Sequence, residues 1–277
     1  MARPSFFGLL LIAPALTMIA ALFLYPLGYS LAAAFTEPGG SLSLMHFQKA
    51  YDLYSTDILF TLFIVIVSTI LIALFSVAIA GILTLGETPW LVGALRQLYR
   101  WPLFIPFIVA AQCMRTFLAK NGLMNNSLVA LGVMEPIQAT SFLDWRGIII
   151  TFVWKQVPFV TLMLAGAMAS IDRATIEAGR NLGASRLRVL IELVLPQVAQ
   201  TLLVGLVLSF VTMLSVLSVP MMVAGSQPTM LTVDMAFRIN SYGDYATANA
   251  LGVISYLIAG TVAWIYLRHN VKREAQA

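Results

Sequence analysis

Between Leu59 and Leu85 the chain carries no charged residue at all. A helix needs about 20 predominantly apolar residues to cross the hydrocarbon core of a bilayer, and this run is longer than that. The composition of the whole chain also indicates membrane-spanning segments, because 60% of the 277 residues are hydrophobic and only 10% are charged. A soluble domain carries about a quarter of charged residues. The sequence therefore predicts an all-α integral membrane protein.

Six apolar runs are expected to form transmembrane helices within a single transmembrane domain that covers residues 1–277. They span approximately residues 6–35, 59–85, 102–118, 147–170, 197–219 and 246–267. The first run is too long for the apolar core of a signal peptide, so we expect a retained span. The third run is the shortest and contains Pro106 and the charged Arg115.

The positions of lysine and arginine predict the orientation of these spans. If the amino terminus is cytosolic, ten of the 16 basic residues fall in cytosolic segments. They are Arg3, Arg96, Arg100, Arg173, Arg180, Arg186, Arg188, Arg268, Lys272 and Arg273. The positive-inside rule then places both termini and the loop over residues 171–196 in the cytosol of a multi-pass protein of the cell inner (plasma) membrane. The net charge of +4 is thus explained by orientation and does not indicate nucleic-acid binding.

The loop over residues 171–196 is a polar segment between two apolar runs. Asp172 is expected to cap a short helix that runs to Leu182, and Gly183 is expected to end that helix in the left-handed conformation. From Ser185 onward, apolar residues recur at helical spacing, which predicts a second, amphipathic helix on the membrane surface or against another helix. Pro196 is expected to start the next element.

This loop resembles the coupling loop of ABC-importer permeases, whose motif runs Glu-Ala-Ala, three residues, Gly, and later an apolar residue and Leu-Pro. The matching positions are Glu177-Ala178-Gly179, Gly183, Ile191 and Leu195-Pro196. Gly179 stands where the motif has its second alanine, which should loosen the helix by up to ~1 kcal/mol. The resemblance implies a type I permease fold of six transmembrane helices with a cytosolic coupling helix.

A second stretch is similar to the spermidine/putrescine-type branch of these permeases. It comprises Arg115-Thr116-Phe117, then Asn121 to Leu128, then Leu131-Gly132-Val133. Phe117 replaces the tyrosine of that branch, and Met124 replaces a leucine.

The resemblance also implies which residues couple transport to ATP hydrolysis. They are Glu177, Ala178, Gly179, Arg180, Leu182, Gly183 and Ala184. The sequence holds no Gly-rich loop of the kind that cradles ATP phosphates, so ATP and Mg are expected on a partner ATPase. The implied partners are a second permease subunit, two ATP-binding subunits, an extracytoplasmic solute-binding protein and the lipid bilayer. No catalytic constellation, metal-binding cluster or cofactor of its own is expected in this chain.

Two ionisable residues within the spans are candidates for the translocation pathway. Arg115 and Lys155 either line the solute path, or serve structural roles, as when an arginine near the end of a span reaches the headgroups. No Asp or Glu lies well inside a span, which disfavours a dication and favours a solute with a carboxylate or phosphonate. The expected cargo is a small polar organic solute that is polyamine-, opine- or aminophosphonate-like. A permease of the sugar type, or a stand-alone carrier or channel, remains the alternative.

Overall fold

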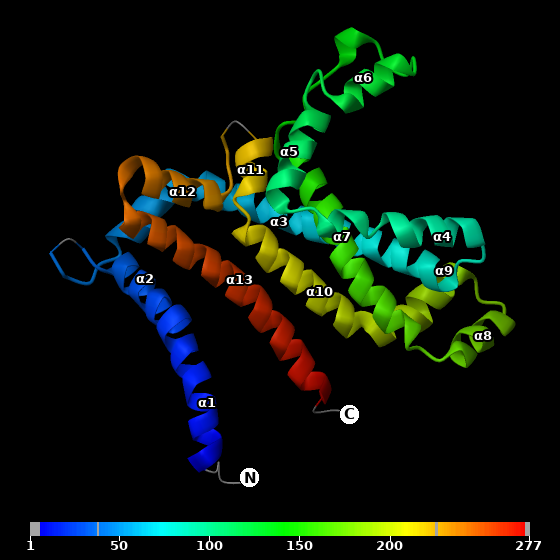
Figure 1. Ribbon diagram of the computed structural model, residues 1–277, viewed down its shortest axis with the longest axis horizontal. Helices are drawn as coiled ribbons and strands as arrows, with labels where there is room; N and C mark the ends of the chain where they lie inside the picture. The colour runs from blue at the N-terminus through cyan, green and yellow to red at the C-terminus, as the bar shows by residue number, and fades with distance from the viewer. Residues whose placement is uncertain (1–5, 38, 225–226, 275–277) are drawn as a thin grey trace. The chain divides into compact units, whose positions relative to one another are not determined.

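The structure is a computed structural model that describes residues 6–37, 39–224 and 227–274. Within these ranges every regular element is helical, apart from an isolated bridge between Thr36 and Leu42. The chain forms two compact units (Figure 1). The first contains the residues up to Ser55 together with Asp234–Leu257, and the second contains Thr56–Val233 and the residues from Ile258 on.

Five helices are long and apolar enough to cross a bilayer, judged over the described residues. They cover Leu11–Phe35, Met45–Leu85, Trp145–Ala169, Arg186–Ser215 and Tyr245–Tyr266. A sixth span results if the pair Pro89–Phe104 and Phe107–Ala130, bent by 110°, is counted as one. The expected all-α architecture with six apolar spans therefore agrees with the structure.

The first unit is held together by polar contacts between its helices. It contains α1 (Phe6–Ile19), the π-helical η1 (Ala20–Leu24), α2 (Tyr25–Phe35) and parts of α3 (Met45–Leu85), α12 (Leu231–Tyr242) and α13 (Tyr245–Glu274). Ser30 donates a hydrogen bond to Asn249 over 2.8 Å, and Lys49 pairs with Asp244 over 2.7 Å. Burial raises the pKa of Asp244, but the hydrogen bonds from Lys49 and Thr247 and the charge of Lys49 together outweigh burial, and the pKa falls to about 2. Asp244 is thus ionised at neutral pH.

Helix α3 begins at Met45, well before the apolar run from Leu59 that the sequence analysis used to define the span. The side chain of Ser43 accepts a hydrogen bond from the Met45 amide, and the following polar residues continue the helix. Asp57 therefore lies inside a long helix, but its carboxylate accepts a hydrogen bond from the Thr229 amide at 2.7 Å. This acid fixes a loop of the second unit.

Two of the helices widen into π turns shortly before a proline. The segment η1 precedes Pro26, and η4 (Val189–Val194) precedes Pro196. A proline lacks the backbone N–H and its ring clashes with the carbonyl four residues earlier, and an inserted π turn relieves both problems without ending the helix. Pro196 was expected to start a new element. It lies at the start of α10 (Leu195–Ser215), but the helix is continuous from Arg186.

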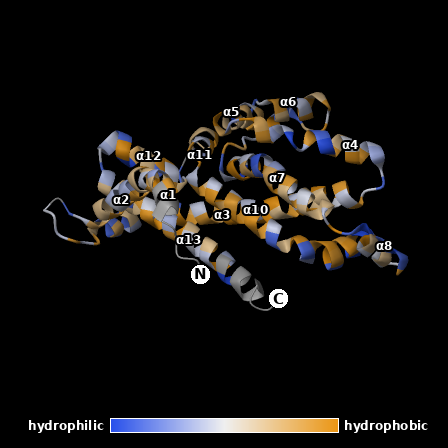
Figure 2. Cartoon of the chain, turned by 60° about the horizontal axis from the view of Figure 1, so that its bottom comes forward, coloured by the Kyte–Doolittle hydropathy of each residue, from blue (hydrophilic) through white to orange (hydrophobic). Residues whose placement is uncertain are grey.

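The second unit has an apolar core formed mainly by α3, α7 (Trp145–Ala169) and α10. Fully buried residues of this core include Ile64, Phe152 and Met213, one from each helix. Figure 2 shows that hydrophobic residues dominate α10 and the part of α3 beside its label. Helix α11 (Ser218–Val223) and α5 (Phe107–Leu118) complete this core.

The third expected span, residues 102–118, is a broken helix. Helix α4 (Pro89–Leu98) leads into the 3-10 turn η2 (Trp101–Phe104), and α5 begins only at Phe107. Ile105 between them is extended, as the residue before a proline tends to be. Beyond α5 lie the short α6 (Leu123–Ala130) and η3 (Pro136–Gln138) (Figure 1).

Candidate coupling site and membrane cavity

Helix α8 (Arg173–Asn181) is the short helix that the sequence predicts in the polar loop. The Asp172 side chain accepts a hydrogen bond from the Ala174 amide over 3.0 Å, which confirms the expected N-cap. Gly183 has φ +83°, which confirms the left-handed turn after Leu182. The Gly183 amide donates to the Arg180 carbonyl and the Ala184 amide to the Gly179 carbonyl. This is the Schellman pattern, and it gives α8 a sharply defined end.

Gly179 is the buried residue of α8, and it faces η4. A Cβ at this position would lie 2.5 Å from Leu193 Cδ1, so the side chain of Leu193 occupies the space that an alanine methyl would take. Gly179, which replaces the second alanine of the expected Glu-Ala-Ala triplet, therefore packs against Leu193. On the other side of η4, a Cβ on Gly81 of α3 would lie 2.7 Å from Leu190 Cδ2. The π segment is thus in close contact with both α8 and α3.

Most other residues of α8 are exposed. Glu177 and Ala178 are both exposed, and the Leu182 side chain at the end of the helix is 89% exposed. Within the described part of the chain, Glu177 forms no hydrogen bond or ion pair. A charged residue next to small and apolar ones on a protruding helix is a surface suited to contact with another protein.

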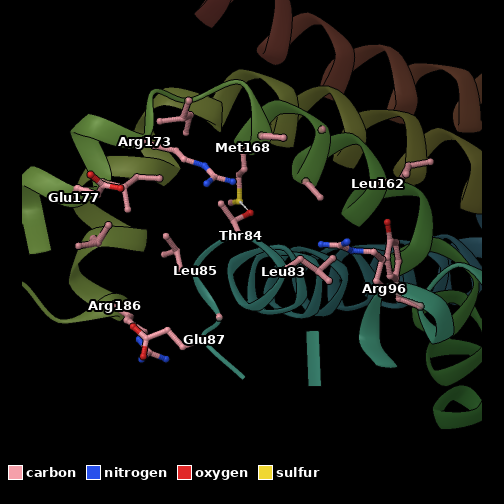
Figure 3. Close-up of a pocket in the computed structure, with 18 of the residues that line it drawn as sticks. Leu83, Thr84, Leu85, Glu87, Arg96, Leu162, Met168, Arg173, Glu177 and Arg186 are labelled. Carbon is pink, nitrogen blue, oxygen red and sulfur yellow. Dashed lines mark hydrogen bonds and ion pairs between the residues drawn. The ribbon is translucent and has the colours of Figure 1, made fainter. Parts of the chain in front are cut away.

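Glu87 connects α8 to the end of α3, a role that was not expected from the sequence. One of its carboxylate oxygens pairs with Arg180 of α8 and the other with Arg186 at the start of α9 (Arg186–Arg188). Figure 3 shows the Glu87 and Arg186 side chains meeting. The hydrogen bond from Arg180 and the charge of Arg186 hold the pKa of Glu87 below its ordinary value. We call Glu87, Arg180 and Arg186 the Glu87 bridge.

A cavity of about 660 Å³ lies between α8 and the ends of α3, α4 and α7 (Figure 3). Besides the Glu87 bridge, its polar lining includes Arg96, Arg100, Arg173 and Glu177. Helix α8 therefore borders this cavity on one side and packs against η4 on another. It is connected to the spans by its packing against η4 and by the Glu87 bridge.

The expected amphipathic stripe after Ser185 is only partly correct. Leu190 and Val194 are buried, but Leu187 and Ile191 are 65% and 52% exposed. Ile191 lies inside the π segment η4, which adds a residue to the turn and rotates its positions away from a 3.6-residue period. The Ser185 side chain caps this helix by accepting from the Arg188 amide.

Lys155 lies at the break between η2 and α5. Its Nζ donates to the carbonyl of Pro102 at 2.6 Å and to that of Leu103 at 3.2 Å. In an unbroken helix the Pro102 carbonyl would accept from residue 106, which is a proline without an N–H. Lys155 supplies this missing donor while the residue remains only 6% exposed. It also lines a second cavity, of about 580 Å³, which we call the Lys155 cavity.

Arg115, the other pathway candidate, is not near Lys155. It is exposed in the last turn of α5, eight residues after the helix start at Phe107. At 1.5 Å per residue this places it about 12 Å further along the helix. The structure does not bring the two candidates into one site.

Comparison with known proteins identifies the family. Residues 79–275 match the family described as binding-protein-dependent transport system inner membrane component. The chain belongs to this family. The expected ABC-importer permease with its all-helical fold of five to six apolar spans is thereby confirmed.

The relatives of this permease are named for different transported solutes. It is 26% identical to the sulfoquinovosyl glycerol transport system permease SmoG of Agrobacterium fabrum, over 94% of this chain and 89% of that protein. It is 28% identical to the trehalose/maltose permease MalF of Thermococcus litoralis, over 64% of this chain and 61% of that protein. The spermidine/putrescine permease PotB of Escherichia coli is 23% identical over 62% of this chain and 64% of its own length, which confirms the similarity to that branch.

Solved structures show the same fold. A bacterial ABC transporter involved in import of the acidic polysaccharide alginate superposes with a TM-score of 0.79 at 21% identity, covering 95% of this chain and 94% of that chain. The MetNI methionine ABC transporter gives a TM-score of 0.59 at 16% identity, covering 78% and 94%.

Proposed function

We propose that this permease subunit forms half of the translocation pathway of an ATP-driven importer and is moved through α8. A second permease subunit would form the other half. Two ATP-binding subunits would hold ATP and Mg and contact α8 from the cytosol, and an extracytoplasmic solute-binding protein would deliver the cargo. Both termini would then be cytosolic, as the distribution of lysine and arginine favours.

The observation that carries this proposal is the construction of α8. Glu177, Ala178 and Leu182 are exposed, Glu177 where it lines the cavity, while Gly179 packs on η4. The Glu87 bridge joins the same helix to α3. A push on the exposed face would therefore reach two spans, α3 and α10, as a rigid-body movement.

The partners are proposed by analogy with solved assemblies. The structure of an alginate ABC transporter in complex with a pentasaccharide-bound periplasmic protein aligns with a TM-score of 0.77, covering 93% of this chain. This supports the kind of complex, while α8 supports the presence of a moving partner on the other side of the membrane.

The solute is proposed to be a small polar organic molecule. The relatives include permeases named for a sulfoquinovosyl glycerol, for trehalose and maltose, and for spermidine and putrescine. Opine- or aminophosphonate-like solutes remain consistent with the scarcity of acidic residues in the spans. The sugar-type alternative is supported by the identity to SmoG over almost the whole chain.

Two substitutions test the coupling role. Glu177→Lys reverses the charge on the exposed face of α8, and Gly183→Trp puts a bulky residue at φ +83°. Both are expected to abolish uptake in the assembled importer while the protein remains inserted in the membrane. Normal solute-stimulated ATP hydrolysis in either variant would refute the role of α8.

A channel or a stand-alone secondary carrier is the rival function. Reconstitution of the permease pair with and without the ATP-binding subunits separates the two. We expect uphill accumulation only when the ATP-binding subunits and ATP are present. Accumulation without them would establish the rival.

A further inference from the structure

The Lys155 cavity lies where the broken span meets α7 and α10. It is lined by Pro106 and Phe107 at the start of α5, by Lys155, Gln156 and Phe159 of α7, and by Thr212 of α10. Its volume of about 580 Å³ is within the range of cavities that bind small molecules. It combines three aromatic rings, those of Phe104, Phe107 and Phe159, with an ammonium, an amide and a hydroxyl.

The charge of Lys155 is not neutralised by any acidic residue in the described part of the chain. Both of its hydrogen bonds go to backbone carbonyls, and the expected spans that contribute to the cavity contain no Asp or Glu. A lysine has three N–H donors, so one donor is left after the hydrogen bonds to the Pro102 and Leu103 carbonyls. The Phe107 ring lies 5.2 Å from Nζ, but a buried cation with no anionic partner and a spare donor is a site for an anionic oxygen.

Gln156 provides a second, independent observation. It is 6% exposed, lines the same cavity, and its Nε2 is buried without a hydrogen-bond partner in the described structure. A buried amide donor without a partner is costly, and native proteins seldom retain one without a ligand or another use for it. A rotation of the side chain that brings Nε2 to the cavity would let a hydroxyl or carboxylate oxygen of a bound solute satisfy it.

We propose that the Lys155 cavity is a solute subsite within the membrane and that it selects an anionic, hydroxylated solute of the sugar-acid class. Lys155 holds the carboxylate or sulfonate, Gln156 donates to an oxygen, and the rings of Phe107 and Phe159 pack on the apolar face of the solute. The subsite proposal rests on the proposed importer function, and it assigns a chemical class to the transported solute. A dication such as a polyamine is disfavoured here by the charge of Lys155.

The binding of three probes to the assembled importer, without its solute-binding protein, tests the proposal. The probes are radiolabelled D-glucuronate, D-glucose and spermidine. We expect saturable binding of glucuronate, with weaker binding of the neutral sugar and none of spermidine. Absence of glucuronate binding, or equal binding of glucose or spermidine, would overturn the proposal.

Four variants assign the binding to this cavity. Lys155→Met is expected to weaken glucuronate binding about tenfold or more, because a charge-assisted contact is lost, while Lys155→Arg keeps it. Gln156→Leu is expected to weaken it several-fold, and it makes no structural hydrogen bond whose loss would unfold the protein. Arg115→Met, which removes a cation outside the cavity, serves as the control and should leave binding unchanged.

Unchanged glucuronate binding in both Gln156→Leu and Lys155→Met would overturn the subsite. If Lys155→Met fails to assemble, Gln156→Leu decides the question alone. Co-purification with the ATP-binding subunits reports separately on the proposed function. Loss of that association would refute the importer role, whereas intact association with no anion selectivity would refute the subsite only.

Discussion

At the scale of single residues, Glu87 is the most informative position in the structure. Its carboxylate contacts two arginines that belong to different parts of the coupling loop. All three side chains are about half exposed, so the bridge contributes little to global stability. We expect the Glu87 bridge to fix the position of α8 relative to α3.

Glu87→Gln tests this role. It removes the charge that holds Arg180 and Arg186, so we expect several-fold slower ATP-driven uptake in proteoliposomes with an almost unchanged melting temperature. Glu192→Gln is the matched control, because Glu192 pairs with Arg188 within the same helix and does not reach α3. Equal loss of uptake in both variants would contradict a specific role for Glu87.

The pH dependence of the bridge follows from the lowered pKa of Glu87. A depressed carboxyl pKa means that the contact is fully present above the ordinary value of 4.5 and is lost only as the pH falls below it. The mobility of a spin label at Thr175→Cys, in a Cys113→Ser background, should therefore stay constant from neutral pH down to about pH 5. A rise in mobility already near pH 6 would show that another group controls α8.

The roles of Glu87 and Lys155 depend on partners that are far away in the sequence. Lys155 was recognised as costly inside a span, but its contacts with Pro102 and Leu103 are set by where the third span breaks. Glu87 lies between the second and third expected spans, where nothing local points to a partner. A signal was present, since this acid precedes the third span on the side where the arginines of the coupling loop were expected, but sequence distance hides the pairing.

At the scale of elements, the contact of α8 with η4 is the main support of the coupling helix. Gly179 allows the two backbones to approach, and Leu193 fills the space above it. The N-cap at Asp172 and the turn at Gly183 could be predicted, because capping is a local property of the chain. The contact between α8 and η4 could not, because the π segment shifts the register of the apolar residues.

A larger residue at position 179 should separate these elements. Gly179→Val would crowd Leu193 and is expected to cost about 1–3 kcal/mol in overpacking. Gly179→Ala is expected to be tolerated, because the end of the Leu193 side chain can move aside. Hydrogen exchange over residues 186–194 should accelerate in the valine variant only.

Ala174→Val controls for the lower helix propensity of valine, since Ala174 is an exposed residue of the same helix. Its exchange over residues 186–194 should match that of the unmodified protein. Faster exchange in this control would mean that helix propensity, and not packing on η4, determines the stability of the contact.

At the scale of the whole molecule, hydropathy predicts five of the spans directly and the sixth only if the bent helix pair counts as one. The uncharged run from Leu59 to Leu85 requires a membrane, and the other runs follow by length. Hydropathy could not show that α3 extends back to Met45 through polar residues, nor that the third span bends by 110°. These features depend on caps, prolines and long-range hydrogen bonds.

The central claim is that this permease is moved by an ATP-binding partner through the exposed end of α8. Leu182→Cys in a Cys113→Ser background places a single thiol on that end, because Cys113 is the one cysteine of the sequence. In the assembled importer, we expect a thiol cross-linker to join this position to the ATP-binding subunit and to stop uptake until the link is cleaved. Labelling of this thiol from the extracytoplasmic side, or undiminished uptake by the cross-linked complex, would contradict the claim.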